Sequence, residues 1–220
     1  MSHVWDLKAV DLDGAIQEAD AAVEGDTRAQ FFRKAAIGGG SVLAAGSVMG
    51  ILAEQSWAAP SRRQDTAILN YALTLEYLED AFYTQALKNN TPAAGDVLES
   101  TKIVQDHERV HVNFLKKTLG GSAVKQPTFD FGAAVTDPAM FLATSVVLED
   151  TGVKAYSGQA TRILSPTVVK AAVSILTVEA RHASRFRSLA GQNFAPLAFD
   201  RPASMRTILA AVKKTGFIKS

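Results

Sequence analysis

The sequence predicts an all-α protein whose main domain is a four-helix bundle, with a long crossover between the second and third helices and a short C-terminal helix. A Glu-x-x-His motif occurs twice, as Glu108 with His111 and as Glu179 with His182, and an isolated Glu precedes each copy on an apolar helical stripe. Residues three apart lie on one face of a helix, so each motif directs a carboxylate and an imidazole toward one point. Together with the isolated glutamates, Glu76 and Glu149, these side chains form a ligand set that suits two metal ions in a bundle core.

The spacing of these residues indicates an internal duplication. Glu108 follows Glu76 by 32 residues, and Glu179 follows Glu149 by 30. The spacing therefore predicts that each half is an antiparallel pair of helices, with Glu on the first helix and Glu-x-x-His on the second. Each half also has a Tyr seven residues after its first Glu, which favours two related halves around a pseudo-twofold axis.

Helical periodicity and capping signals give the order of the elements. Asn89 to Pro92 and Ser165-Pro166 have the residues that end one helix and start the next, and Gly120 is a typical helix end. Residues 122–137 lack a helical period and are long enough to cross the bundle from end to end. The predicted helices cover residues 66–89, 92–119, 138–164, 166–190 and, in the tail, 205–212. The predicted divisions are an export signal over 1–59, the bundle over 60–192 and a tail over 193–220 that packs on the outside of the bundle.

Composition excludes several classes of function. The chain has 220 residues, a net charge of +1 and no basic block interleaved with aromatic residues, so nucleic acid is not an expected partner. It contains no Cys, which excludes disulfides, thiolate metal sites and iron–sulfur clusters. A metal must therefore be held by oxygen and nitrogen, which suits iron and manganese and also zinc.

The N-terminal region is typical of an export signal. Basic residues at 28–34 precede nineteen uncharged residues, 35–53, and a small-x-small site ends at Ala58. The region resembles a twin-arginine signal in which Ala29 stands in place of the second Arg. We expect export to the periplasm or cell envelope, with an uncleaved membrane anchor as the alternative, so that any membrane contact is made through this segment alone.

A pair of metal ions needs carboxylates between and around the two cations, because the ions repel each other. In the usual arrangement Glu108 and Glu179 would bridge both ions, and His111 and His182 would each bind one. Glu76 and Glu149 would then bind at the two ends. Four unpaired buried carboxylates would each cost several kcal/mol, so the metal-free protein has to protonate, hydrate or loosen them.

Neighbouring residues leave several assignments open. Tyr83 and Tyr156 are candidate electron relays, with hydrogen bonding in the core as the alternative. His107 is a candidate partner of a ligand, with exposure to solvent as the alternative. The outer nitrogens of the two ligand histidines have three candidate carboxylate partners, Asp80, Asp106 and Asp150.

The sequence resembles the ferritin-like superfamily and, within it, the group that includes desiccation-related proteins. The resemblance rests on residues 75–83, the two Glu-x-x-His motifs, Leu148-Glu149 and the tail segment 198–202. It implies a di-iron or dimanganese bundle, often exported, in oxidative or drying stress. Two functions follow as expectations: redox chemistry on Fe(II), dioxygen or peroxide, or a non-catalytic protective role in which metal stabilises the fold. Storage of iron in an oligomeric cage is a third possible function, but the sequence has no signature of such an oligomer. A homo-oligomer of another kind is compatible with the sequence.

Overall fold

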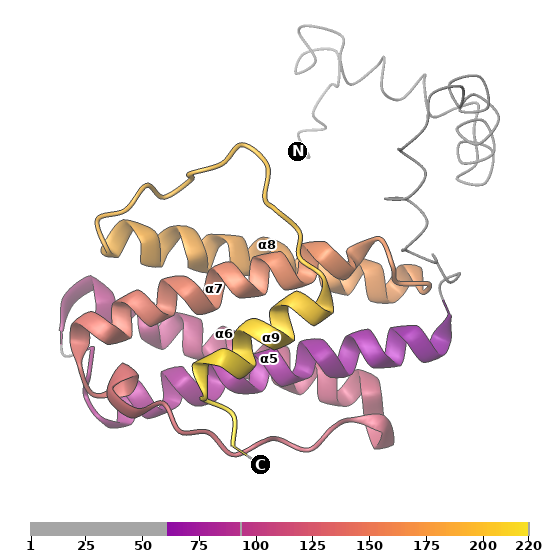
Figure 1. Ribbon diagram of the computed structural model, residues 1–220, viewed down its shortest axis with the longest axis horizontal. Helices are drawn as coiled ribbons and strands as arrows, with labels where there is room; N and C mark the ends of the chain where they lie inside the picture. The colour runs from indigo at the N-terminus through magenta and orange to yellow at the C-terminus, as the bar shows by residue number, and fades with distance from the viewer. Residues whose placement is uncertain (1–60, 93, 220) are drawn as a thin grey trace, which may run out of the picture. The chain divides into compact units, whose positions relative to one another are not determined.

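The structure, a computed structural model, describes residues 61–92 and 94–219, and the predicted export segment lies outside them. Four long helices run alongside one another, and a short helix lies across them (Figure 1). The described part contains no strand, and its one isolated bridge joins Phe129 to Ile218. The α-helices are α5 (Arg62–Lys88), α6 (Gly95–Leu119), α7 (Pro138–Ala160), α8 (Pro166–Leu189) and α9 (Met205–Thr215), with 3-10 turns η2 (Gly120–Ser122) and η3 (Gly132–Val135). The predicted all-α bundle with a long crossover is confirmed.

Local sequence explains most of the helix ends. Asp137 caps α7 by accepting a hydrogen bond from the Met140 amide at 2.8 Å, and a Pro follows it at the first helical position. Ser165 caps α8 in the same way through the Val168 amide at 3.4 Å. Gly120 ends α6 with φ of 54°, a left-handed conformation that favours glycine. These short-range bonds satisfy backbone groups that would otherwise have no partner at the helix ends.

The start of α6 differs from the prediction. Helix was expected from Pro92, with Thr91 as its cap, but α6 begins at Gly95. Thr91 is buried and its hydroxyl donates a hydrogen bond to the carbonyl of Val135, next to the third helix. Thr91 therefore makes a long-range contact instead of capping α6, and helical periodicity in the sequence cannot predict such a contact.

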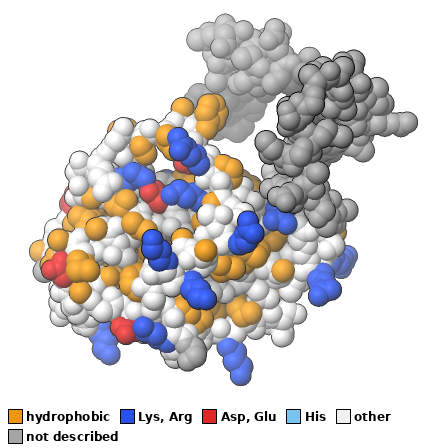
Figure 2. All heavy atoms as spheres, viewed as in Figure 1, with side chains coloured by type: hydrophobic (Ala, Val, Ile, Leu, Met, Phe, Trp, Pro, Cys, Tyr) orange, Lys and Arg blue, Asp and Glu red, His pale blue; other side chains and the backbone are white. Residues whose placement is uncertain are grey.

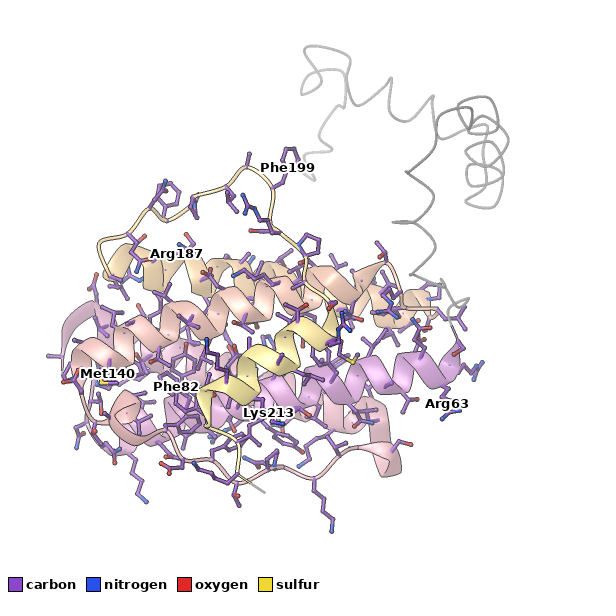
Figure 3. All side chains as sticks on the ribbon, viewed as in Figure 1. Arg63, Phe82, Met140, Arg187, Phe199 and Lys213 are labelled. Carbon is purple, nitrogen blue, oxygen red and sulfur yellow. The ribbon has the colours of Figure 1, made fainter. Side chains whose placement is uncertain are left out.

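Packing follows the two predicted pairs. Helix α5 packs mainly on α6 and α7 mainly on α8, while α5 also touches α7 and α6 touches α8. One apolar cluster is aromatic and centres on Phe82, which is fully buried and has the rings of Phe131 and Phe141 at 5.4 and 5.3 Å. Figure 3 shows Phe82 inside the bundle and Phe199 on the outer loop between α8 and α9. A second cluster combines aliphatic side chains such as Ile68 with Tyr77 and Tyr156 and gathers other core positions of the four helices.

The short helix α9 packs on the outside of the bundle, mainly against α7. Ile208 and Val212 of α9 are buried in the same cluster as Phe82. The tail also meets α7 directly, because the Ala203 amide donates to the Lys154 carbonyl at 3.1 Å. Gly158 permits this approach, since a Cβ there would lie 1.9 Å from the Ala203 carbonyl oxygen.

The face that carries α9 shows Lys and Arg side chains, a smaller number of Asp and Glu side chains, and hydrophobic side chains between them (Figure 2). No histidine side chain is visible there, and His111 and His182 are both buried. Of the helices that the structure describes, none is long and apolar enough to cross a membrane.

Candidate metal centre

The four long helices bring all six predicted ligands together in two overlapping groups. Each residue of a group offers a ligand atom within 4.8 Å of the others. Glu108 and Glu179 belong to both groups, whereas each of the other four belongs to one. The first group is Glu76, Glu108, His111 and Glu179, and the second is Glu108, Glu149, Glu179 and His182. This is the arrangement expected if two carboxylates bridge and four residues bind at the ends.

The two tyrosines connect the halves of the bundle reciprocally. The Tyr83 hydroxyl on α5 donates to Glu149 on α7, and the Tyr156 hydroxyl on α7 donates to Glu76 on α5. Burial, and then the adjacent carboxylate, raises the pKa of each tyrosine, so both hydroxyls stay protonated and fix one oxygen of their glutamate. Hydrogen bonding in the core is thus observed for both residues, and an electron-relay role stays a prediction.

The shared carboxylates are in an unusual electrostatic environment. Glu108 and Glu179 are fully buried, and burial raises the pKa of both, that of Glu179 to about 8. Burial opposes protonation of His111, but the close carboxylates of Glu108, Glu179 and Glu76 outweigh this effect and raise the pKa of the imidazole. Its Nδ1 lies 3.1 Å from Glu108 Oε2, 3.2 Å from Glu76 Oε2 and 3.3 Å from Glu179 Oε1. Protons on the imidazoles and carboxylates therefore offset the negative charge that gathers here.

The donor atoms fit a pair of cations. Glu108 Oε1 and both oxygens of Glu179 are buried and accept no hydrogen bond from the described residues. Glu108 Oε1 does lie 3.0 Å from His182 Nδ1, but without the geometry of a hydrogen bond. Space around Glu179 depends on Gly152, because a Cβ there would lie 2.8 Å from Glu179 Oε2. Buried carboxylate oxygens without hydrogen-bond partners suit hard or borderline divalent ions with oxygen and nitrogen ligands.

His107 is the hydrogen-bond partner of the predicted ligand His182, a role that the sequence left undecided. It is exposed, yet its Nδ1 lies 2.9 Å from His182 Nε2. Burial, and then the charge of His182, lowers the pKa of His107, which favours a neutral ring that can accept the Nε2 proton of His182. That hydrogen bond would keep His182 Nδ1 free of hydrogen and aimed at the carboxylates.

We expect His107→Leu to weaken metal binding about 10- to 100-fold, because His182 would lose the acceptor that fixes its tautomer and ring orientation. His107→Gln should lose less, since its amide oxygen can still accept. Titration against a competing chelator measures both affinities. Equal affinities of the wild type and His107→Leu would show that the histidine pair does not support the site.

Within the described residues, none of the three aspartates proposed as histidine partners forms a hydrogen bond with His111 or His182. Asp80 accepts from Gln105 Nε2 at 2.9 Å and from Arg109 Nη2 at 3.2 Å. Asp150 pairs with Arg187 through both of its oxygens. Asp106 contributes only a weak electrostatic effect on His107. The partner is instead His107, whose Nδ1 lies beside the outer nitrogen of the His182 ring, Nε2.

Glu79 is a further buried carboxylate that sequence reasoning passed over. It is 3% exposed, and burial, followed by the charges of Glu179, Glu149, Glu108 and Glu76, raises its pKa well above the usual range. Glu79 could have been identified from the sequence, because it lies three residues after Glu76 and therefore on the same face of the helix. In the other half of the duplication Gly152 occupies the corresponding place, three after Glu149, so the two halves of the centre are not equivalent.

Metal uptake should depend on pH. The raised pKa of Glu179, about 8, means that the metal-free carboxyl holds its proton at pH 7, and a bound cation must displace it. Affinity for Mn²⁺ should therefore fall as pH falls from 8 to 6, by about tenfold per unit for each proton released. Calorimetry in buffers of different ionisation enthalpy counts these protons. A pH-independent affinity with no proton release would contradict this.

Comparison with known proteins agrees with this geometry. The family described as ferritin-like domain matches residues 64–192, a segment that contains all six predicted ligands. No curated protein shows significant similarity to the chain.

Proposed function

The chain belongs to the ferritin-like domain family, and from this premise we propose that it holds two iron or manganese ions between Glu76, Glu108, His111, Glu149, Glu179 and His182. The observation that carries the proposal is the overlap of two buried groups that share Glu108 and Glu179. Zinc could occupy the same donors, since its ligand preferences overlap. When bound, iron or manganese would supply electrons and Lewis acidity for reactions with dioxygen or peroxide or for oxidation of Fe(II).

The protein's own residues would perform three tasks at this centre. The buried carboxylates would supply four negative charges, which match two divalent cations. Tyr83 and Tyr156 would hold the end carboxylates by one oxygen each and leave the other oxygen for a cation. The aromatic cluster around Phe82 would exclude water from one end of the bundle. A role in oxidative or drying stress follows from such chemistry and from the resemblance to desiccation-related proteins.

Turnover of Fe(II) and of peroxide by the metal-loaded protein tests the proposed chemistry. We expect oxidation at the wild-type centre and a loss to the uncatalysed rate in Glu108→Ala, which removes an oxygen donor from both groups. Equal rates in the two proteins would remove the enzymatic claim and leave the alternative, a metal-stabilised protective protein. Metal analysis of protein purified from its native host then distinguishes iron from manganese.

We also propose that the protein is exported, on the basis of residues 1–59, which precede the described residues. A fusion of this segment to a reporter tests the route. Export that is lost when the twin-arginine translocase is deleted would support the resemblance to that class of signal. Unchanged export would contradict it, and a membrane-bound reporter would indicate an uncleaved anchor.

A further inference from the structure

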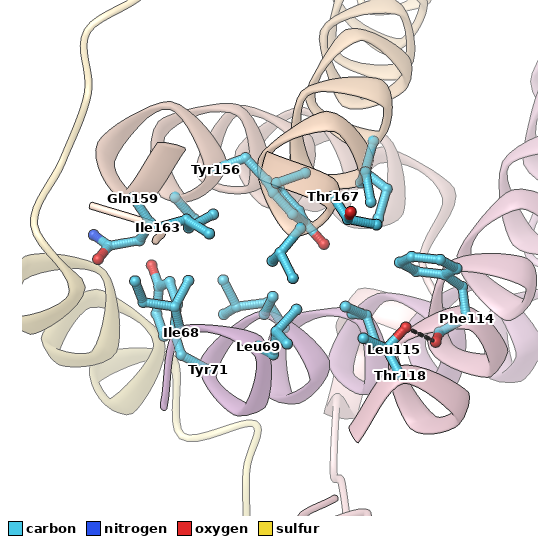
Figure 4. Close-up of a pocket in the computed structure, with 17 residues that line it drawn as sticks. Ile68, Leu69, Tyr71, Phe114, Leu115, Thr118, Tyr156, Gln159, Ile163 and Thr167 are labelled. Atoms are coloured by element: carbon cyan, nitrogen blue, oxygen red, sulfur yellow. Dashed lines mark hydrogen bonds between the residues drawn. The ribbon is translucent and has the colours of Figure 1, made fainter. Parts of the chain in front are cut away.

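A cavity of about 130 Å³ lies between the four long helices, beside the candidate metal centre (Figure 4). Three of its lining residues, Ala72, Leu115 and Ile175, are each four positions from a predicted ligand along their own helices. Four residues of helix rise about 6 Å, so the cavity begins roughly one turn from the centre. Tyr156 connects the two features, because it lines the cavity and donates its hydroxyl to Glu76.

The wall is almost entirely aliphatic and aromatic, but it has three polar atoms without partners. The hydroxyl of Tyr71 and both amide atoms of Gln159 are buried and make no hydrogen bond with any described residue. Both residues line the cavity, and Figure 4 shows their polar ends on the same side of it. Each buried polar group without a partner destabilises the folded protein, and none of these three atoms belongs to a predicted metal ligand. A ligand that offers hydrogen bonds here would remove this cost.

The charges around the cavity select a neutral ligand. No Lys, Arg, Asp or Glu is among its lining residues. Burial, and then the charge of Glu79, raises the pKa of Tyr71, so its hydroxyl stays a donor. A carboxylate ligand would meet the negative field of the nearby glutamates, and an ammonium group would find no anion in the wall. A hydroxyl both donates and accepts, which matches the amide of Gln159 and the phenol of Tyr71.

The size and the opening of the cavity define the rest of the ligand. An apolar protein cavity of about 150 Å³ accommodates a molecule the size of benzene, so about six carbons fit here. Phe114, Thr118 and Thr167 line the side away from Gln159 and are exposed, which places the entrance there. A ligand that enters polar end first reaches Gln159 while its chain stays against the aliphatic wall.

We propose that this cavity binds a small uncharged amphiphile, of which a straight-chain alcohol of about six carbons is the simplest, with its hydroxyl on Gln159 and Tyr71. The inference goes beyond the proposed redox function, because it assigns an organic ligand to the protein. None of the atoms that carry it belongs to a predicted metal ligand.

Binding of 1-hexanol to the full chain, measured by calorimetry in the presence of a chelator, tests the inference independently of the metal centre. We expect one molecule per chain, and binding at least tenfold weaker for hexanoate, hexylammonium and 1-methoxypentane, which lacks the hydroxyl proton. Ala172→Phe should abolish binding by filling the cavity, whereas Ala143→Phe, at an exposed position of α7, should not alter it.

The Gln159→Leu variant tests the polar contact of the ligand separately from the shape of the cavity. This variant should lose most of the preference for 1-hexanol over 1-methoxypentane, because the Gln159 oxygen that accepts the hydroxyl proton is gone and the remaining Tyr71 hydroxyl can donate to the oxygen of either molecule. Circular dichroism verifies that each variant is folded. Failure of the wild type to bind 1-hexanol would overturn the proposal, as would equal binding of the alcohol and its ether by the wild type. Binding that persists in folded Ala172→Phe would place the ligand elsewhere and overturn it too.

Discussion

Glu108→Ala should lose both metal ions, whereas Glu149→Ala should retain about one. Glu108 contributes to both groups of ligands, and Glu149 contributes to the second group alone. Loss of Glu108 removes an oxygen from each ion and also the negative charge between them, so the remaining ligands face stronger repulsion between the cations. Loss of Glu149 leaves the first group with all four of its residues.

Metal content per chain after loading and desalting, measured by plasma mass spectrometry, checks this difference. Glu99→Ala is the matched control, because Glu99 also lies on α6 but is exposed, and its one ion pair among the described residues is with Lys102 at 3.0 Å. It should keep both ions. If Glu108→Ala and Glu149→Ala retained the same amount of metal, Glu108 would not act as a bridge.

Phe82→Ala should cost about 3–5 kcal/mol in the free energy of unfolding, a large part of the stability of a domain this size. Phe82 is 0% exposed, and its ring lies 5.1 Å from Tyr83 and 5.3 Å from Phe141. The substitution removes apolar contacts on several helices at once and leaves a cavity that the bundle can only partly close. Through Tyr83 it should also loosen the hydrogen bond to Glu149.

Urea unfolding of the metal-free protein measures this cost without a contribution from metal binding. Phe199→Ala is the control, since Phe199 is 88% exposed on the loop before α9 (Figure 3) and its truncation should change stability by less than about 0.5 kcal/mol. A cost below about 1 kcal/mol for Phe82→Ala would show that the aromatic cluster does not hold the bundle together.

Spacing along the chain was sufficient to predict which Glu and His side chains meet in the bundle core, because a helix converts a separation of three residues into a shared face. Glu108 with His111 and Glu179 with His182 could therefore be paired from the sequence, and the duplication indicated which glutamates complete the set. Local sequence also placed the starts of α7 and α8 directly after Asp137 and Ser165, where capping is a local interaction. It failed at Pro92, because Thr91 bonds to Val135, 44 residues away.

The sequence by itself determined the four helices, their pairing and the six side chains that meet in the core, since all of these depend on helical period and on a repeated local pattern. Only the tertiary structure decided that His107 rather than an aspartate partners His182, that Glu79 is a further buried carboxylate, and that Tyr71 and Gln159 face a common cavity. Those relations join different helices or depend on burial, and the rotation and depth of each helix are fixed by packing against its neighbours.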